Sequence, residues 1–245
     1  VMKKLLITLL IFSAYSYSAG ENDCGSLEKC DAFSSDVHDL YSLQRGLGIY
    51  MNYCASCHSL KLLRWNRLQK DLVIPENIVT EELIRTPDTK IADHMTFGMP
   101  EISPIGAPDL TLRTRVRGDE WIYTYLRAYY EDSSKQYGVN NLVYPGTAMP
   151  NVLLSLQGNQ KLVCKEIPVI ARNGGEKRDE FGKTITKEKC GFLEVEEGTG
   201  QLSKEEFDNL IYDLTNFLVY VGEPSKATRE RIGWYVVFYF LIFTA

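Results

Sequence analysis

The feature that most constrains this chain is the five-residue sequence Cys54-Ala55-Ser56-Cys57-His58. The pattern C-x-x-C-H is typical of covalent attachment of a c-type haem. On a helical turn, residues three and four positions apart face the same side. We therefore expect the sulfurs of Cys54 and Cys57 to form thioether bonds with the haem vinyl groups, while His58 binds the iron. Covalent attachment holds the cofactor in both redox states, which suits an electron carrier.

Two other sites use a C-x-x-C pair, namely a redox-active dithiol and half of a zinc site. A thioredoxin-like dithiol needs a βαβ unit, which the sequence does not indicate. A zinc site needs a second pair at close spacing, and Cys24 and Cys30 are too far apart to provide it. The histidine next to Cys57 favours haem.

The two ends of the chain differ from its middle. Lys3 and Lys4 precede an apolar run, and small residues follow up to Gly20, so residues 1–19 are predicted to be a signal peptide. Residues 234–245 carry no charge but are fewer than the about 20 that cross a bilayer. We interpret 229–245 as the start of a truncated C-terminal membrane anchor, with an apolar core segment as the alternative. Residues 20–228 would then form a periplasmic haem domain.

Charge and cysteine content narrow the possible partners. The formal net charge is −5, and it becomes more negative when Lys3 and Lys4 are removed. An acidic surface of this kind excludes nucleic acid as a natural partner and favours a basic protein. Export permits disulfides, and the four cysteines outside the haem motif are Cys24, Cys30, Cys164 and Cys190.

Three helices are predicted from apolar spacing. The first covers 41–56 and leads into the haem motif, and the second covers 119–130 with Asp119 as its cap. The third has the clearest amphipathic stripe, over 207–221, with a capping box formed by Ser203 and Glu206. Small residues at Gly46 and Gly48 would let this third helix cross the first one closely.

Residues 161–195 instead predict a β-hairpin around the turn Asn173-Gly174-Gly175. Cys164 and Cys190 lie nearly symmetrically about that turn, as a cross-strand disulfide would require. Such a bond would restrain the unfolded chain by roughly 3 kcal/mol. Cys24 and Cys30 could form a smaller second bridge. The pairing itself cannot be deduced from sequence, and a buried free thiol is the alternative for each cysteine.

A low-spin haem iron needs a second axial ligand besides His58. His38 stands beside acidic residues and is expected on the surface, and His94 would give a bis-histidine site as a minor alternative. Methionine fits better, because the loops around Met149 and Met99 both contain Gly and Pro, and Met–His ligation raises the reduction potential. We choose Met149 over Met99.

Two further methionines are expected to have no part in the haem site. Met51 lies in the first predicted helix and Met95 lies close to Met99. A buried methionine is commonly an apolar space-filler, so both are expected in the core or at the surface.

The ordered set of motifs resembles the cytochrome c1 family in its bacterial form. It comprises Leu43-Gln44-Arg45-Gly46, the haem motif, Ala107-Pro108-Asp109-Leu110, the segment 144–150 and the apolar C-terminus. The resemblance implies a mainly α, class I cytochrome c-like haem domain with long loops and a small β-hairpin insertion, followed by one truncated C-terminal transmembrane helix. It also implies one covalent haem c.

The resemblance also implies roles for individual residues. It makes Met149 the sixth iron ligand and places Arg115 on a haem propionate, with Arg113 and Arg117 as neighbouring alternatives. The chain departs from the family around 117–121, where the segment looks shortened and Trp121 replaces a tyrosine, and in the enlarged hairpin. These departures concern the propionate contacts and leave the ligands unchanged.

By the same resemblance the chain is an electron-carrying subunit of quinol–cytochrome c reductase and no enzyme on its own. It would take electrons from the Rieske iron–sulfur protein, assemble with cytochrome b and pass electrons to a c-type cytochrome. Its haem domain would face the periplasm from the bacterial cytoplasmic membrane, with the C-terminal helix in contact with lipid. The alternatives are a free-standing anchored cytochrome that donates to a terminal oxidase, a peroxidase-like haem enzyme, and a thiol or structural protein without haem.

Overall fold

The computed structural model describes residues 23–97, 106–171 and 174–244. The predicted signal peptide, Met99 and Asn173 therefore lie outside the described residues. The helical segments, in chain order, are α2 (Leu40–Ile49), the π-helical turn η1 (Tyr50–Cys54), α3 (Trp65–Leu72), the π-helical turn η2 (Ile78–Leu83), α4 (Arg113–Arg117), α5 (Asp119–Arg127), α6 (Leu154–Gln157), α7 (Lys204–Gly222) and α8 (Lys226–Thr244).

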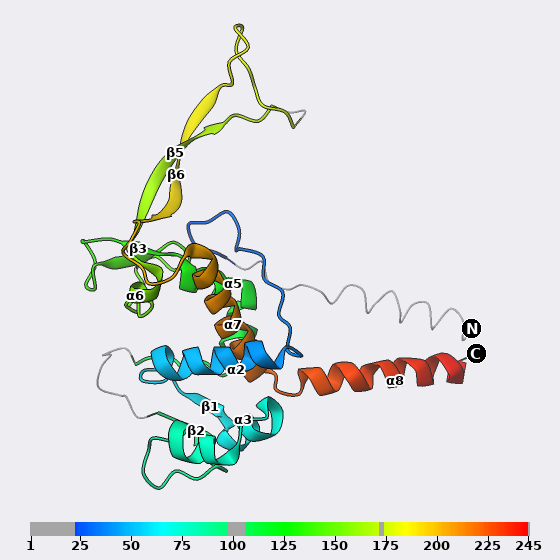
Figure 1. Ribbon diagram of the computed structural model, residues 1–245. Coiled ribbons are helices and arrows are strands. Elements are labelled where there is room, and N and C mark those ends of the chain that lie inside the picture. Colours follow the sequence, from blue (N-terminus) through cyan, green and yellow to red (C-terminus); the bar gives the residue numbers. More distant parts are fainter. Residues whose placement is uncertain (1–22, 98–105, 172–173, 245) are drawn as a thin grey trace.

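The strands of the described residues form separate two-stranded antiparallel sheets. They are β1 (Leu60–Arg64) with β2 (His94–Met95), β3 (Tyr129–Glu131) with β4 (Val139–Asn141), and β5 (Gln160–Pro168) with β6 (Thr186–Val195). In Figure 1 the first two sheets lie on the body of the molecule, and the third projects from it as a long arm.

The centre of the body is the crossing of α2 over α7 (Figure 1). A Cβ atom added to Gly46 would collide with the backbone carbonyl of Asp213 and would lie 2.6 Å from the Cβ of Phe217. Only glycine allows the two backbones to come this close. Gly48, which was also expected at the crossing, has no atom within 4 Å of such a Cβ, so one glycine alone makes the contact.

Polar contacts of the residues that precede Gly46 also hold the crossing. The guanidinium of Arg45 binds the carboxylate of Asp213 through two hydrogen bonds of 2.5 and 2.9 Å. The amide of Asn216, which is fully buried, donates to the hydroxyl of Ser42 at 3.0 Å and to the carbonyl of Asp36 at 2.8 Å. These bonds set the register of α7 against α2 and tie the N-terminal segment to both helices.

The predicted third helix is confirmed, and the other two helices end earlier than expected. α7 begins with the capping box of Ser203 and Glu206 and buries the predicted apolar stripe. The first helix continues past Ile49 as a π-helical turn, in which the Ala55 N–H bonds the Tyr50 carbonyl at 2.9 Å. The second has Gly118 (φ 89°) as its cap, with Asp119 as its first residue.

The end of the second predicted helix shows why spacing alone was misleading. The chain leaves α5 at Arg127, and the following residues become strand β3, which pairs with β4. Tyr129 opposes Asn141 in this pairing and is buried. The apolar spacing of 119–130 fits a longer helix, but the partner strand decides the conformation.

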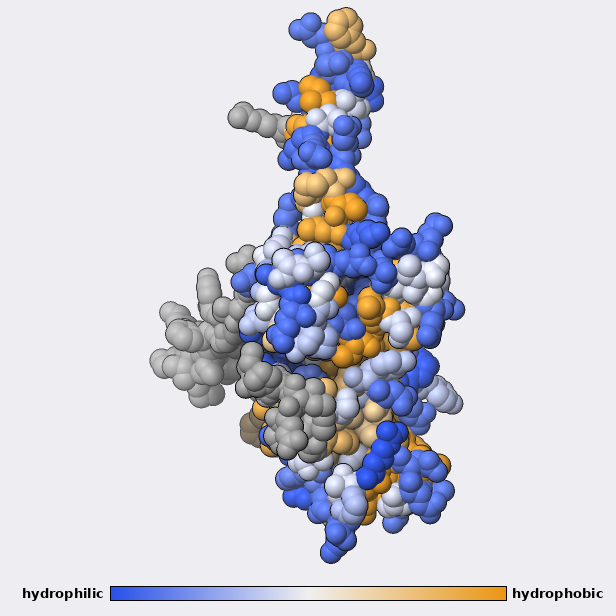
Figure 2. Space-filling view, turned by 90° about the vertical axis from the view of Figure 1, so that its left-hand side faces the viewer, coloured by the Kyte–Doolittle hydropathy of each residue, from blue (hydrophilic) through white to orange (hydrophobic). Residues whose placement is uncertain are grey.

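The predicted hairpin at 161–195 is confirmed in its paired strands, but the segment that connects them contains, besides the predicted turn, a second one bridged by Arg178 and Thr184. β5 and β6 pair over their whole length, with Cys164 opposite Cys190, and these two residues form a disulfide. Cys24 and Cys30 form the other disulfide in the described residues. Figure 2 shows apolar side chains gathered near the base of the arm, where Leu162 and Val195 are about two-fifths exposed.

The predicted fold class, mainly α with a C-terminal transmembrane helix, is wrong. Helix accounts for 41% and strand for 17% of the structure. α8 carries Lys226, Arg229, Glu230 and Arg231 among its 19 residues. Within the described residues, no helix is at once long and apolar enough to cross a membrane.

Gly46→Ala is expected to lower the free energy of unfolding by about 1–3 kcal/mol, because overpacking forces the two helix backbones apart. Gly48→Ala is the matched control, since it lies in the same helix with open space around it. Its expected effect is neutral or stabilising by up to about 1 kcal/mol through helix propensity. Denaturant unfolding of the two purified variants measures both changes, and equal effects would contradict the close crossing.

Candidate haem site

The attachment motif forms the helical turn that the sequence predicts. The N–H groups of Cys57 and His58 both bond the Cys54 carbonyl, at 3.1 and 2.9 Å. Tyr50, fully buried one turn earlier, donates its hydroxyl to the His58 carbonyl at 2.6 Å. The Tyr50 ring also packs on Phe217 of α7, with 5.8 Å between centroids. The turn is thereby fixed to the crossing of α2 and α7.

Cys54 and Cys57 are the free cysteines of the described residues. Burial raises the pKa of the Cys54 thiol to about 12, whereas dithiol exchange needs a thiolate. The described part of the chain also holds no group of three or more His, Cys, Asp or Glu side chains that could bind a metal ion. These observations disfavour the zinc and dithiol alternatives and leave two thiols for thioether bonds.

His58 is held as a neutral imidazole. Its Nδ1 lies 2.7 Å from the Pro108 carbonyl, and a carbonyl only accepts, so Nδ1 carries the proton and Nε2 keeps its lone pair. Burial lowers the pKa of His58, and the positive charge of Arg113 lowers it further against the opposing effect of the Pro108 bond. A neutral imidazole with its second nitrogen bonded to a carbonyl is the usual state of an iron-binding histidine. The donor set therefore fits haem c.

A short segment positions the Pro108 carbonyl. We call residues 108–111 the Pro108 segment. The Asp109 carboxylate accepts from the N–H of Lys61 at 2.7 Å and from the N–H of Thr111 at 3.0 Å, and the Leu110 N–H bonds the Ser59 carbonyl at 3.0 Å. In the sequence this segment is only a family marker, and its contact with His58 was not predicted. The sequence feature that could have indicated an ordered turn here is a proline, which lacks an N–H, followed by an aspartate that can accept a hydrogen bond from the backbone two residues further on.

Met149 lies in the loop that follows β4, and we call residues 142–150 the methionine loop. The side-chain carbonyl of Asn141 accepts from the N–H of Val143 at 2.9 Å, and that of Asn140 accepts from the N–H of Gly146 at 2.8 Å. Thr147 accepts from the Met149 N–H at 3.3 Å. Met149 is half-buried against the core. Its role as iron ligand stays a prediction, as does the alternative at Met99, which lies outside the described residues.

The three arginines of α4 have different surroundings. Arg115, the predicted propionate contact, forms an ion pair with Glu223 at 2.9 Å and is more than half exposed. Arg117 lies over the ring of Trp121, 5.2 Å from its centroid. Arg113 is the arginine whose charge acts on His58. The propionate role of Arg115 stays a prediction, and Arg113 and Arg117 stay its alternatives.

His38, Met51 and Met95 agree with their predicted places, and the alternative role of His94 as an iron ligand stays untested. His38 is exposed and lies 3.3 Å from Glu230. His94 is exposed on β2, where it pairs with Arg64. Met51 and Met95 are buried in the core.

The chain is similar to known proteins over nearly its whole length. The profile of the Cytochrome C1 family matches residues 31–96. A cytochrome c1 of Allochromatium vinosum is 40% identical over 244 residues, which cover 97% of this chain and 92% of that protein. An ammonia monooxygenase gamma subunit of Nitrosomonas europaea is 33% identical over 95% of this chain and 88% of its own length. A mitochondrial cytochrome c1 heme protein of Schizosaccharomyces pombe is 24% identical over 84% of this chain and 64% of its own length.

The similarity runs through the attachment turn, the Pro108 segment and the methionine loop alike, since it covers almost every residue. The donor set of the turn independently fits a covalent haem. This chain therefore belongs to the cytochrome c1 family, a family of electron-transferring c-type cytochromes that carry one covalently bound haem c.

Proposed function

We propose that this chain is the haem subunit of a quinol–cytochrome c reductase. It accepts single electrons from a Rieske iron–sulfur protein and passes them to a c-type cytochrome, on the periplasmic side of a bacterial cytoplasmic membrane and in assembly with cytochrome b. The observation that carries this proposal is the near full-length similarity to a cytochrome c1. The attachment turn with its neutral histidine supports it.

The roles of the residues follow from their positions. Haem c, when bound, supplies a one-electron couple. Cys54 and Cys57 would hold the porphyrin by thioether bonds, and His58 would bind the iron through Nε2. The Pro108 carbonyl keeps the proton on His58 Nδ1 and makes the imidazole a stronger donor. We assign the opposite face of the iron to the Met149 thioether.

A closed iron site distinguishes a carrier from an enzyme. If His58 and Met149 both hold the iron, it would keep no open position for a peroxide or another substrate. Met–His ligation also raises the reduction potential, as in cytochromes c. We assign a haem propionate to Arg115, with Arg113 and Arg117 as the alternatives, because a guanidinium binds a carboxylate through two parallel hydrogen bonds.

The acceptor is proposed to be a basic cytochrome, because the chain is acidic overall and opposite charges speed encounter. The acidic residues at the end of β6 contribute little to this. Glu194 pairs with Lys165 at 2.6 Å, and Glu196 pairs with Lys161 at 3.1 Å. The charges of Glu194 and Glu196 are therefore largely compensated within the hairpin.

Met149→Leu is expected to abolish the Met–iron charge-transfer band, to lower the reduction potential and to let carbon monoxide bind. The physical reason is that leucine has the size of methionine but no donor atom. Visible spectroscopy, redox titration and carbon monoxide binding on the purified holoprotein measure these effects.

Two variants serve as controls for Met149→Leu. Met95→Leu changes a fully buried methionine and should cost less than about 1.5 kcal/mol without altering the spectrum. Met99→Leu tests the alternative ligand. Loss of the band in Met99→Leu with retention in Met149→Leu would reject Met149.

Asp109→Ala is expected to raise the reduction potential by some tens of mV, on the scale where 59 mV is tenfold for one electron. Without the carboxylate, the Pro108 segment loses its bonds to Lys61 and Thr111, so the Pro108 carbonyl holds His58 less firmly and the imidazole donates less to ferric iron. Asp109→Asn removes the same charge but keeps one acceptor oxygen. A smaller rise of the reduction potential in Asp109→Asn than in Asp109→Ala supports the hydrogen-bond role of Asp109. Equal rises would show that only the loss of its charge matters.

Assembly distinguishes the proposed complex from its alternatives. When native membranes are solubilised, we expect this chain to purify with cytochrome b and the Rieske protein and to show quinol–cytochrome c reductase activity. Purification without them would indicate a free-standing cytochrome that donates to a terminal oxidase. Purification with an ammonia-oxidising enzyme would instead indicate the assembly named for the Nitrosomonas relative.

A further inference from the structure

The segment that precedes α2 makes an unusually close contact with the methionine loop. We call residues 23–31 the N-terminal loop; its disulfide joins Cys24 and Cys30. Gly25 has φ +65°, and a Cβ atom added there would lie 2.5 Å from the Leu142 carbonyl oxygen and would also collide with the Val143 carbonyl. Both are backbone atoms and cannot swing aside. The backbone at Gly25 therefore rests directly on the backbone of the methionine loop.

Hydrogen bonds fasten this contact. The Ser26 N–H donates to the Leu142 carbonyl at 2.8 Å. The indole N–H of Trp121, on α5, donates to the Asp23 carbonyl at 3.1 Å. Cys24 is almost completely buried. The N-terminal loop is thus held against both α5 and the start of the methionine loop.

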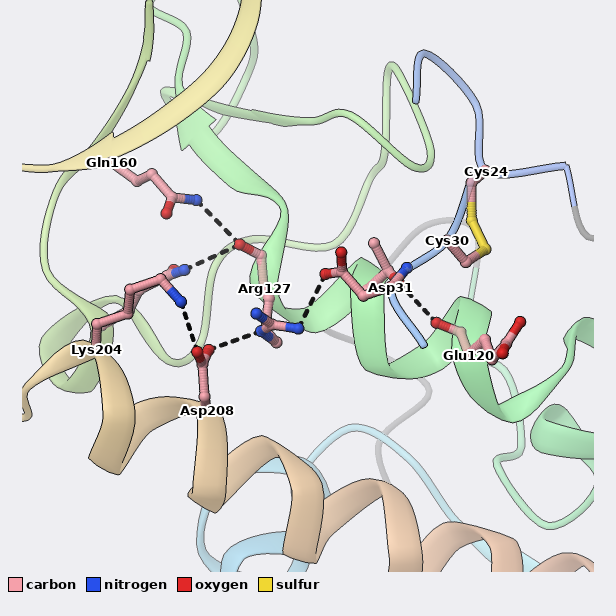
Figure 3. A network of polar contacts seen from close by, with 10 residues as sticks. Cys24, Cys30, Asp31, Glu120, Arg127, Gln160, Lys204 and Asp208 are labelled. Carbon is pink, nitrogen blue, oxygen red and sulfur yellow. Dashed lines mark hydrogen bonds and ion pairs between the residues drawn. A yellow bond between two sulfur atoms is a disulfide. The ribbon is translucent and has the colours of Figure 1, made fainter. Parts of the chain in front are cut away.

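The other end of the N-terminal loop is anchored on α5 and α7, as Figure 3 shows. The Asp31 carboxylate forms an ion pair with Arg127 at 2.9 Å, and its N–H donates to the Thr124 hydroxyl at 2.8 Å. Arg127 in turn binds Asp208 of α7 at 2.7 Å. Both ends of the N-terminal loop are therefore bound to α5, Asp23 through Trp121 and Asp31 through Arg127. This leaves the loop little freedom to move away from Leu142.

A second path joins the same loop to Met149. Trp121, which holds Asp23, stacks on Tyr125 with 5.0 Å between ring centroids. The Tyr125 hydroxyl lies 2.9 Å from the Thr147 hydroxyl and 2.6 Å from that of Tyr129. Tyr129 donates to the Met149 carbonyl at 3.3 Å. The two paths meet the methionine loop at its start and at Met149 itself.

We propose that the N-terminal loop is a positioning element for the sixth iron ligand, which clamps the methionine loop through Gly25 and Trp121 so that Met149 is held ready for the iron. This proposal rests on the assignment of Met149 as ligand. The physical reason for such a clamp is preorganisation. A free loop would lose conformational entropy when its thioether binds the iron. A clamped loop has lost that entropy on folding.

Gly25→Ala tests the clamp, with Gly138→Ala as its matched control. Gly138 has φ +68° and no atom within 4 Å of an added Cβ, so both variants carry the same backbone strain but only Gly25→Ala pushes the methionine loop. We expect Gly25→Ala to weaken the charge-transfer band, to lower the reduction potential and to speed carbon monoxide binding about tenfold, the ratio that corresponds to about 1.4 kcal/mol. Gly138→Ala should leave all three unchanged.

Trp121→Phe keeps an aromatic ring on Tyr125 but removes the donor to Asp23. It should show the same changes to a smaller degree. It still tests the clamp if Gly25→Ala does not fold. If both variants keep the band, the reduction potential and the carbon monoxide binding while Met149→Leu abolishes the band, the clamp proposal is wrong and the ligand assignment stands. An unchanged band in Met149→Leu would instead overturn the ligand assignment on which the clamp rests.

Discussion

The close approach of α2 and α7 at Gly46 is the contact on which the rest of this structure depends. With no side chain at Gly46, the backbone of α7 comes close enough for Phe217 to pack on Tyr50. Tyr50 in turn bonds the His58 carbonyl. The packing of two helices that are far apart in sequence thereby sets the position of the haem-binding turn, and a helix–helix contact becomes part of the cofactor site.

The segments that would form the two sides of the proposed haem site are built by different physical means. On the histidine side the groups are close in sequence, because Cys54, Cys57 and His58 share one turn. The Pro108 segment is held against this turn by short hydrogen bonds to His58 and Lys61. On the methionine side Met149 belongs to an irregular loop, supported by asparagine and tyrosine side chains and by the N-terminal loop. Irregular loops lack the repeating bonds of a helix, so they need such supports to hold one conformation.

Several elements could be predicted because their signals are local. The capping box of Ser203 and Glu206, the apolar stripe of α7 and the turn-centred pair Cys164 and Cys190 all appear in the structure as expected. The errors arose where partners elsewhere in the chain decide the outcome. Tyr129 fits the spacing of a helix but pairs as a strand with Asn141. The predicted transmembrane helix is a separate error: it rested on an apolar run, and no helix of the described residues is long and apolar enough to cross a membrane.

The sequence by itself determined the chemistry of the attachment turn, since a pattern of five adjacent residues is sufficient to place two thiols and an imidazole on one face. It also determined the family, through motifs that occur in a fixed order. Only the tertiary structure decided that Gly46 rather than Gly48 makes the helix crossing, that Pro108 orients His58, and that Gly25 rests on the methionine loop. These contacts join residues far apart in the chain, and no local pattern records which backbone a residue will meet when the chain folds.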